Sequence, residues 1–239
     1  MNCSTFGRRK MRRTPELVDC GGDAKAGAVL VLPGGFIRSR GRYWRFVETE
    51  LRALFPLLSR EGDGPAVYLL RYRCRGWNGG REDTAVDARW ALGQIEERHG
   101  EVPVAVVGNS LGGRAGFRIA GHPHITTVVG VAPWLPEEEE TEHLAGRKVL
   151  IIHGERDHSS AGARRSLAYA ERARLAVPDL ARLEVPGEGH YLLRRSADVW
   201  TTTADFVHDA LGVTAAPLPL TQALERARDG DLRTPLPTM

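Results

Sequence analysis

The chain has 239 residues, of which 42% are hydrophobic and 26% charged, and a formal net charge of +3, as expected for a soluble globular protein with one substantial core. Both signs of charge are mixed and no basic stripe carries interleaved aromatic residues, which argues against a nucleic-acid partner. The basic N-terminus is not followed by an apolar run long enough for a signal peptide, and no apolar run in the chain is long enough to span a membrane. The three cysteines, Cys3, Cys20 and Cys74, are an odd number at irregular spacing and match neither a disulfide framework nor a zinc site. We therefore expect a cytoplasmic protein without membrane contact.

The composition divides the chain into three segments. Residues 1–27 are basic and are expected to form a mobile N-terminal segment, and residues 28–211 carry the pattern of a folded catalytic domain. Residues 212–239 form a Pro-rich tail with one short amphipathic helix around residues 220–227, either docked on the domain or disordered.

Short apolar runs alternate with helical periodicity between residues 28 and 211, which is typical of β-α-β units wound into a parallel sheet. The predicted strands are 28–32, 66–70, 104–107, 126–131, 148–152 and 182–185. The predicted helices are 44–58, 84–99, 114–120, 163–173 and 197–211. The expected fold class is therefore α/β, with a mostly parallel central sheet of about six strands and helices on both faces. The segment between the fourth and fifth strands is too short for a large cap domain, and its acidic run, residues 137–140, is expected to be a solvated loop.

A glycine-flanked serine stands at a strand-to-helix junction, in Gly108-Asn109-Ser110-Leu111-Gly112 after the strand 104–107. This arrangement is typical of a tight turn that exposes a nucleophile, because side chains two positions before and after the serine would collide with neighbouring backbone. The turn also places Ser110 at the positive end of the next helix, where backbone N–H groups stabilise developing negative charge. We therefore predict Ser110 as a nucleophile; the alternative is an ordinary glycine-rich turn.

A serine hydroxyl needs a base, and histidine suits this task at neutral pH. His190 lies in a glycine-rich loop after the last predicted parallel strand, and Asp157 follows the preceding strand, so both stand at carboxyl ends of strands, where such sheets gather their sites. The chain order serine, acid, histidine is the order of the α/β-hydrolase architecture. We predict His190 as the general base and Asp157 as the acid that orients it, with His153 as the alternative base.

The oxyanion donors are predicted from the turn after the first strand. Pro33-Gly34-Gly35-Phe36 follows that strand, where this architecture supplies a second backbone N–H, so donors are expected at Leu111 and at Gly35 or Phe36. Trp77, Trp134 and Tyr191 stand near strand ends and are candidates for a substrate pocket, although each suits a core position equally well.

These residues together resemble the α/β-hydrolase superfamily over nearly all of residues 28–211. Within it the chain is similar to small dienelactone-hydrolase-like and esterase members of actinobacterial type. The resemblance implies an acyl-enzyme on Ser110, His190 acting as base and then as acid, no cofactor and no metal. The sequence departs from the family at Asn109 and Pro33, where histidine is frequent. It also leaves too few residues before position 28 for the two leading strands of the full fold, which are expected to be missing or reduced.

The predicted function is hydrolysis of a small, neutral carboxylic ester, because an uncapped pocket with aromatic walls suits short acyl groups. Thioesters and lactones require the same residues and stay open, as does acyl transfer or cyclisation in a biosynthetic pathway. A non-catalytic binding protein on a hydrolase scaffold is the alternative from a different class. The expected partner is a small ester-type molecule; the sequence leaves the natural substrate and a homodimer undecided.

Overall fold

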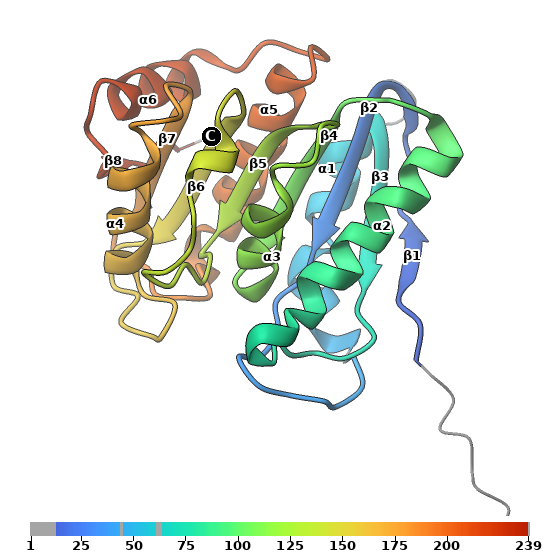
Figure 1. The fold of residues 1–239 in the computed structure, drawn as a ribbon. Coiled ribbons are helices and arrows are strands. Elements are labelled where there is room, and N and C mark those ends of the chain that lie inside the picture. The colour runs from blue at the N-terminus through green and yellow to red at the C-terminus, as the bar shows by residue number, and fades with distance from the viewer. Residues whose placement is uncertain (1–12, 44, 61–63, 239) are drawn as a thin grey trace, which may run out of the picture.

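The computed structural model describes residues 13–43, 45–60 and 64–238. Its centre is an eight-stranded sheet in the order β1-β3-β2-β4-β5-β6-β7-β8 (Figure 1). β1 runs antiparallel to β3, and the other neighbouring strands are parallel. The strands are β1 (Glu16–Asp19), β2 (Asp23–Leu32), β3 (Pro65–Arg71), β4 (Val104–Asn109), β5 (Ile125–Val131), β6 (Lys148–Gly154), β7 (Leu180–Val185) and β8 (Thr234–Pro235).

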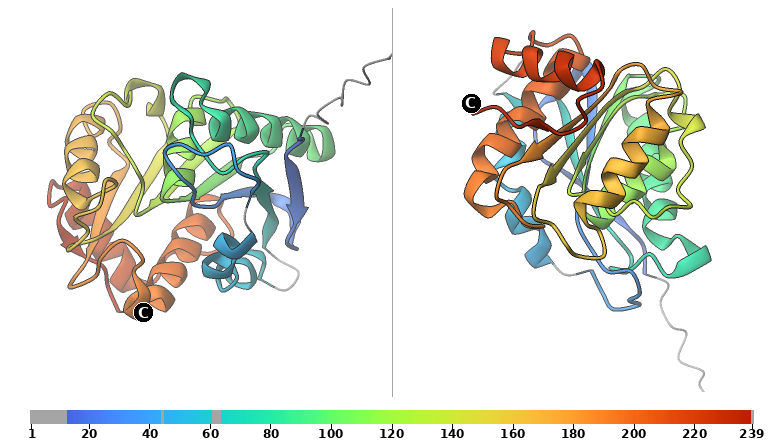
Figure 2. Two further views of the ribbon diagram at one scale, coloured as in Figure 1. Left: turned by 90° about the horizontal axis from the view of Figure 1, so that it is seen from below. Right: turned by 90° about the vertical axis from the view of Figure 1, so that its left-hand side faces the viewer.

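Helices cover both faces of this sheet, and Figure 2 shows the resulting three layers. The α-helices are α1 (Leu54–Ser59), α2 (Asp83–His99), α3 (Leu111–Ile119), α4 (Ala163–Ala173), α5 (Ser196–Ala210) and α6 (Leu218–Arg228). The 3₁₀ helices are η1 (Arg45–Leu51), η2 (Gly79–Arg81), η3 (Glu142–Leu144) and η4 (Leu193–Arg195). The side chains of β2 alternate between two hydrophobic clusters, with Leu30 and Leu32 packed toward α2, α3 and α4 and Val29 and Val31 packed toward α1, α5 and α6. This burial on both faces explains the continuous apolar runs in the sequence.

The fold class predicted from the sequence is confirmed, and each of the six predicted strands is present. The sheet has two strands more than predicted, β1 and β8. β1 lies within residues 1–27, so the expectation of a mobile segment is wrong for residues 16–19, which pair along their length with β3. The same expectation is wrong for residues 23–27, which are the first residues of β2, and residues 1–12 lie outside the described residues.

Two predicted helices differ in detail from the structure. The stretch 44–58 is interrupted, because η1 ends at Leu51 and α1 begins at Leu54. α3 begins at Leu111, directly after the serine and three residues before the predicted start. The first turn of α3 therefore lies at the nucleophile turn itself.

The C-terminal tail is docked on the sheet. α6 buries Leu220, Ala223, Leu224 and Ala227 in the same hydrophobic cluster as α1 and α5. Beyond it, the amide of Leu236 donates to the carbonyl of Glu184 at 2.7 Å, next to the short pairing of β7 with β8. The amphipathic helix predicted in this tail is thus present and packed.

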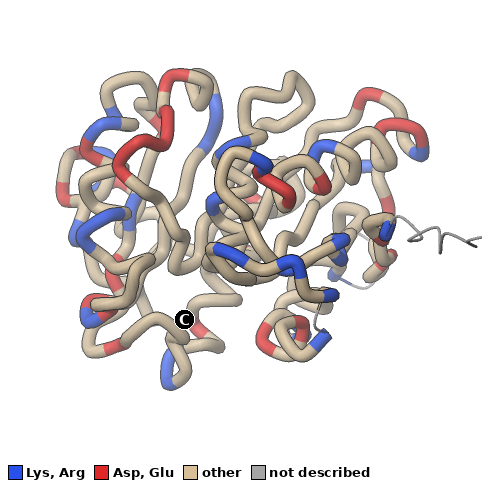
Figure 3. The backbone as a smooth tube through the Cα atoms, turned by 60° about the horizontal axis from the view of Figure 1, so that its bottom comes forward, with Lys and Arg blue, Asp and Glu red and all other residues tan. Residues whose placement is uncertain are grey.

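Both signs of charge are spread through the fold. Lys and Arg positions and Asp and Glu positions are distributed over the backbone in Figure 3, as the mixed sequence predicts. No helix among the described residues combines the length and apolar character needed to cross a membrane.

Candidate active site

Ser110 occupies a strained turn between β4 and α3. Its φ of 51° lies in the left-handed region, which a serine adopts only when the surrounding structure holds it there. A side chain at Gly108 would place its Cβ 2.4 Å from the carbonyl oxygen of Gly112, and one at Gly112 would lie 2.1 Å from the carbonyl oxygen of Leu32. Both glycines are therefore required by contacts across the turn, for the steric reason predicted from the sequence.

Ser110, His190 and Asp157 form one hydrogen-bonded chain. Ser110 Oγ lies 3.0 Å from His190 Nε2, and His190 Nδ1 lies 2.7 Å from Asp157 Oδ2. The loops after β4, β6 and β7 carry the three residues to the same edge of the sheet. The loop of His190 packs closely on β6, because a Cβ at Gly154 would lie 2.3 Å from the carbonyl oxygen of Gly189. The structure thus brings together the three residues that the sequence singled out.

Asp157 is held as a carboxylate by three donors. Oδ2 accepts from His190 and, at 2.9 Å, from Nε2 of His153, while Oδ1 accepts from the amide of Ser159 at 2.8 Å. Burial disfavours the charged form, but the hydrogen bonds from these three groups outweigh it and hold the pKa of Asp157 well below its usual value. An ionised Asp157 keeps the His190 ring in the orientation that presents Nε2 to the serine.

His153 contacts the acid rather than the serine, so the alternative assignment of His153 as base finds no geometric support. Its side chain is fully buried, and its Nδ1 has no hydrogen-bond partner among the residues that the structure describes. Burial lowers the pKa of His153, against the opposing effect of Asp157, which favours a neutral ring that donates from Nε2. The sequence signal for this contact was the spacing His153-Gly154-Glu155-Arg156-Asp157, in which the strand end precedes the acid by four residues.

These side chains also provide the one described cluster of His, Cys, Asp and Glu that is tight enough to hold a metal ion. One ligand atom from each of His153, Asp157 and His190 lies within 4.8 Å of the others. However, a single carboxylate oxygen already accepts from both imidazoles. Since a metal would have to replace those hydrogen bonds, the donor set suits an oriented imidazole better than a cation site.

Two backbone N–H groups are free beside Ser110. Among the described residues, the amides of Gly35 and Leu111 donate to no other group, and both residues line a cavity of about 190 Å³ that also contacts Ser110 and His190. The amide of Phe36, by contrast, donates to the carbonyl of Arg75 at 2.8 Å. Of the two alternatives predicted for the second oxyanion donor, the geometry therefore favours Gly35, and the prediction of Phe36 is wrong.

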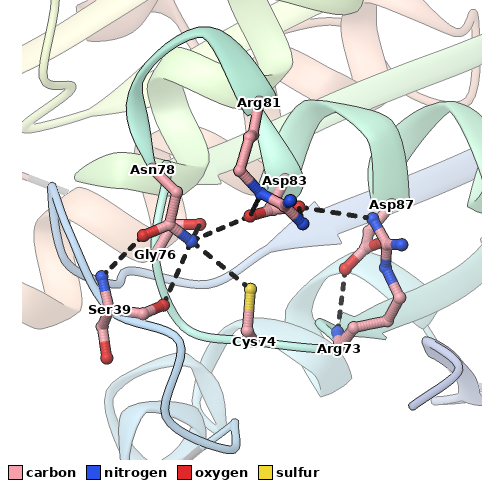
Figure 4. A network of polar contacts seen from close by, with 8 residues as sticks. All are labelled: Ser39, Arg73, Cys74, Gly76, Asn78, Arg81, Asp83 and Asp87. Carbon is pink, nitrogen blue, oxygen red and sulfur yellow. Dashed lines mark hydrogen bonds and ion pairs between the residues drawn. The ribbon is translucent and has the colours of Figure 1, made fainter. Parts of the chain in front are cut away.

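Asn78 ties the loop that carries Gly35 to the segment after β3 (Figure 4). Its Oδ1 accepts from the amide of Ser39 at 2.9 Å, and its Nδ2 donates to the carbonyl of Ser39 at 3.2 Å and to the carboxylate of Asp83 at 2.9 Å. The backbone amide of Asn78 adds a 3.0 Å hydrogen bond to the carbonyl of Ile37. Asn78 thus holds the loop at Ile37 and Ser39, while backbone hydrogen bonds with Arg75 and Trp77 hold it at Phe36. No motif in the sequence marks Asn78 for this role.

The predicted pocket residues divide between the cavity walls and the core. Tyr191 lines a cavity of about 220 Å³ that opens onto Ser110, and Trp134 lines the smaller cavity of about 190 Å³. Trp77 lines neither and is 3% exposed. Of the two alternatives given for Trp77, a pocket position and a core position, the structure therefore favours the core, where the ring supports the site from behind.

Arg114, one turn after Ser110, organises that support. Its guanidinium carbon lies 4.0 Å from the ring centre of Trp77 and 4.5 Å from that of Trp134. Its Nε donates to Glu139 at 2.6 Å, and Arg118 pairs with the same carboxylate at 2.8 Å. Glu139 is buried, so the expectation of a solvated acidic loop is wrong at this position.

Comparison with known proteins gives a structural likeness alone. No known protein family and no curated protein matches the sequence. A putative α/β hydrolase of unknown function from Agrobacterium tumefaciens superimposes with a TM-score of 0.66 at 18% identity, over 86% of this chain and 95% of that one.

Two further solved structures are similar. An esterase from Pyrococcus furiosus matches with a TM-score of 0.63 at 18% identity, over 83% of this chain and 87% of that one. A monoacylglycerol lipase from Paleococcus ferrophilus matches with a TM-score of 0.61 at 15% identity, over 84% of this chain and 99% of that one. With its sheet order, its helices on both faces and these neighbours, the chain has the α/β-hydrolase fold.

Proposed function

We propose that this protein is a serine hydrolase that cleaves a neutral carboxylic ester through an acyl-enzyme on Ser110. The observation that carries the proposal is the 3.0 Å contact between Ser110 Oγ and His190 Nε2, beside the two free amides of Gly35 and Leu111. A hydroxyl, a base and two aligned donors are the groups that acyl transfer requires.

In the acylation step, Ser110 Oγ attacks the carbonyl carbon of the ester while His190 Nε2 takes the hydroxyl proton. The carbonyl oxygen becomes an oxyanion and accepts hydrogen bonds from the amides of Gly35 and Leu111. When the tetrahedral intermediate collapses, the bond to the alcohol oxygen breaks and His190 donates its proton to that oxygen. Asp157 stabilises the imidazolium that exists between these two transfers.

In the deacylation step, a water molecule attacks the acyl carbon and His190 takes its proton. The bond to Ser110 Oγ breaks, and the proton returns to that oxygen as the carboxylic acid leaves. The cycle is balanced by water alone, so the proposal includes no cofactor and no metal ion.

The same residues would also cleave a thioester or a lactone, and an alcohol or amine in place of water would give an acyltransferase or cyclase. Ester hydrolysis is preferred because the segment between β5 and β6 contains only η3 among its described elements, so nothing there closes the site against water. The proposal further places this protein with small, uncapped, dienelactone-hydrolase-like esterases of actinobacterial type, working in the cytoplasm on a small molecule.

The test is burst-phase hydrolysis of p-nitrophenyl acetate and butyrate, combined with the intact mass after a fluorophosphonate probe. We expect a burst and a single adduct, both lost in Ser110→Ala and both kept in the control Ser59→Ala, whose serine lies at the end of α1. A folded protein that shows neither burst nor adduct would overturn the proposal and favour a binding protein on a hydrolase scaffold.

A further inference from the structure

A second hollow continues the cleft at Ser110. A groove of about 550 Å³ runs between α1 and the start of α5, and it shares Glu50, Asn109 and Tyr191 with the cavity that contains Ser110. The groove therefore adjoins the cavity that Ser110 lines. Its volume lies in the range of small-molecule sites.

Apolar side chains form most of this groove. Val131, Leu192, Val199 and Trp200 are buried side chains that reach its surface, and Pro56 and Leu57 on α1 face Leu193 and Ala197 across it. Binding of a hydrocarbon chain to such a surface is favourable because both apolar surfaces leave water, whereas a polar ligand would find few hydrogen-bond partners there.

The exposed apolar side chains of the protein gather at the same place. Of the ten large exposed apolar side chains in the described part of the chain, six line the groove or the two cavities beside Ser110. These six are Phe36, Ile37, Phe46, Leu57, Tyr191 and Leu193. A concentration of exposed apolar surface around one opening is typical of a binding site for an apolar molecule.

The charge of this opening excludes anionic chains. Among the described residues that line the groove and the adjoining cavity, Glu50 is the one acidic or basic side chain of the Asp, Glu, Lys and Arg class. The other titratable side chains in these linings are His190 and Tyr191. Burial raises the pKa of Glu50, and the nearby His190 opposes this effect. With no Lys or Arg among these lining residues, a carboxylate or phosphate on the ligand would find no cation to pair with.

We infer that the groove between α1 and α5 binds the hydrocarbon chain of a neutral ester whose carbonyl lies at Ser110. This inference rests on the proposed function and extends it, because the sequence suggested a short acyl group whereas the groove has room for a chain of several methylenes. Burial of apolar surface favours an aliphatic chain in the groove, and Glu50, which lines both the groove and the cavity at Ser110, disfavours a chain that carries a negative charge.

The test is a chain-length series of p-nitrophenyl esters from acetate through butyrate and octanoate to dodecanoate. In the wild type, kcat/KM should rise by about twofold or more per methylene up to the length of the groove, since each methylene leaves water. Ala197→Trp fills the groove from an exposed position on α5, and the octanoate-to-acetate ratio should fall by about tenfold or more. Ala168→Trp, at an exposed position on α4 away from these cavities, is the matched control and should keep the wild-type ratio.

A parallel series of alkyl acetates shows whether the groove takes the acyl chain or the alcohol chain. The chain that binds in the groove is the one whose series loses its length dependence of kcat/KM in Ala197→Trp. The inference is overturned if kcat/KM falls steadily with length in both wild-type series, or if Ala197→Trp and Ala168→Trp give the same ratios. Should Ala197→Trp fail to fold by circular dichroism, Ala53→Trp tests the opposite wall of the groove.

Failure of the proposed function gives a different result, namely no hydrolysis of any ester by the folded wild type. The groove is then tested without chemistry, by calorimetric titration of Ser110→Ala with 2-decanone. Saturable binding of 2-decanone that is weakened by adding Ala197→Trp supports the assignment of the groove as a hydrocarbon site. No binding, or binding that Ala197→Trp leaves unaltered, overturns this assignment.

Discussion

Replacing His153 by phenylalanine should separate activity from stability. The change removes the 2.9 Å hydrogen bond to Asp157 while filling most of the space of a fully buried ring. A hydrogen bond to a charged group contributes about 1.5–3 kcal/mol, which corresponds to a factor of about 10 to 150 in rate if all of it is lost at the transition state. Because Asp157 keeps donors from His190 and Ser159, we expect kcat to fall by about tenfold with KM little changed.

The free energy of unfolding should change less than the activation free energy. Phenylalanine also removes the unpartnered Nδ1 of His153, whose burial costs about 1–3 kcal/mol, and this gain offsets the lost hydrogen bond. We therefore expect urea unfolding to shift by about 1 kcal/mol or less at neutral pH. His153→Gln, which keeps a side-chain donor, should recover part of kcat.

The pH dependence of stability gives an independent check of this argument. The folded-state pKa of His153 is lowered, so its neutral form stabilises the fold above the unfolded pKa of about 6.5 and this stability is lost as the pH falls below it. The folded-state pKa of Asp157 is also lowered, so its contribution is present above about 3.9 and is lost on further acidification. Both effects make the wild type lose stability relative to His153→Phe as the pH falls. Unchanged kcat in a folded variant, or a wild type that gains stability relative to His153→Phe on acidification, would refute the reasoning.

Three other changes have distinct expected outcomes. Asn78→Ala should lower kcat by about tenfold while circular dichroism stays native, because the loop that carries Gly35 loses its two side-chain hydrogen bonds between Ser39 and Asn78; an unchanged kcat would show that the loop holds without them. Gly112→Ala should prevent stable folding, since its Cβ would meet a β2 carbonyl at 2.1 Å, whereas Gly80→Ala, with no atom within 4 Å, should leave the melting temperature within a few degrees. Arg114→Met should lower the free energy of unfolding in urea by about 3 kcal/mol, because the buried carboxylate of Glu139 loses one of its partners. Adding Glu139→Gln should restore part of this free energy, whereas additive losses in the double variant would contradict the pairing of Arg114 with Glu139.

Most of the fold could be predicted because the strands β2 to β7 are buried on both faces and therefore read as uninterrupted apolar runs. The two edge strands lack this signal. β1 has only two apolar residues, Leu17 and Val18, and both are only half-buried, so pairing with β3 defines this strand more than an apolar run does. β8 has two residues, one of them Pro235, so no local pattern marks it as a strand.

The meeting of Ser110, His190 and Asp157 at one edge of the sheet was predictable because each follows a strand and because the glycines around Ser110 have a steric cause. What the sequence could not resolve depends on contacts between distant segments. The choice between Gly35 and Phe36 is decided by the carbonyl of Arg75, almost 40 residues further along the chain. The burial of Glu139 is decided in the same way, by arginines on α3.

The sequence separation within the hydrogen-bonded chain has a consequence for folding experiments. Ser110 and His190 are 80 residues apart, and β5 and β6 must both be in place before the loops after β4 and β7 meet. Non-local parallel pairing is a slow event in folding. During refolding from urea, helix content should therefore return before the fluorophosphonate reactivity of Ser110, and that reactivity reports completion of the native sheet rather than its onset.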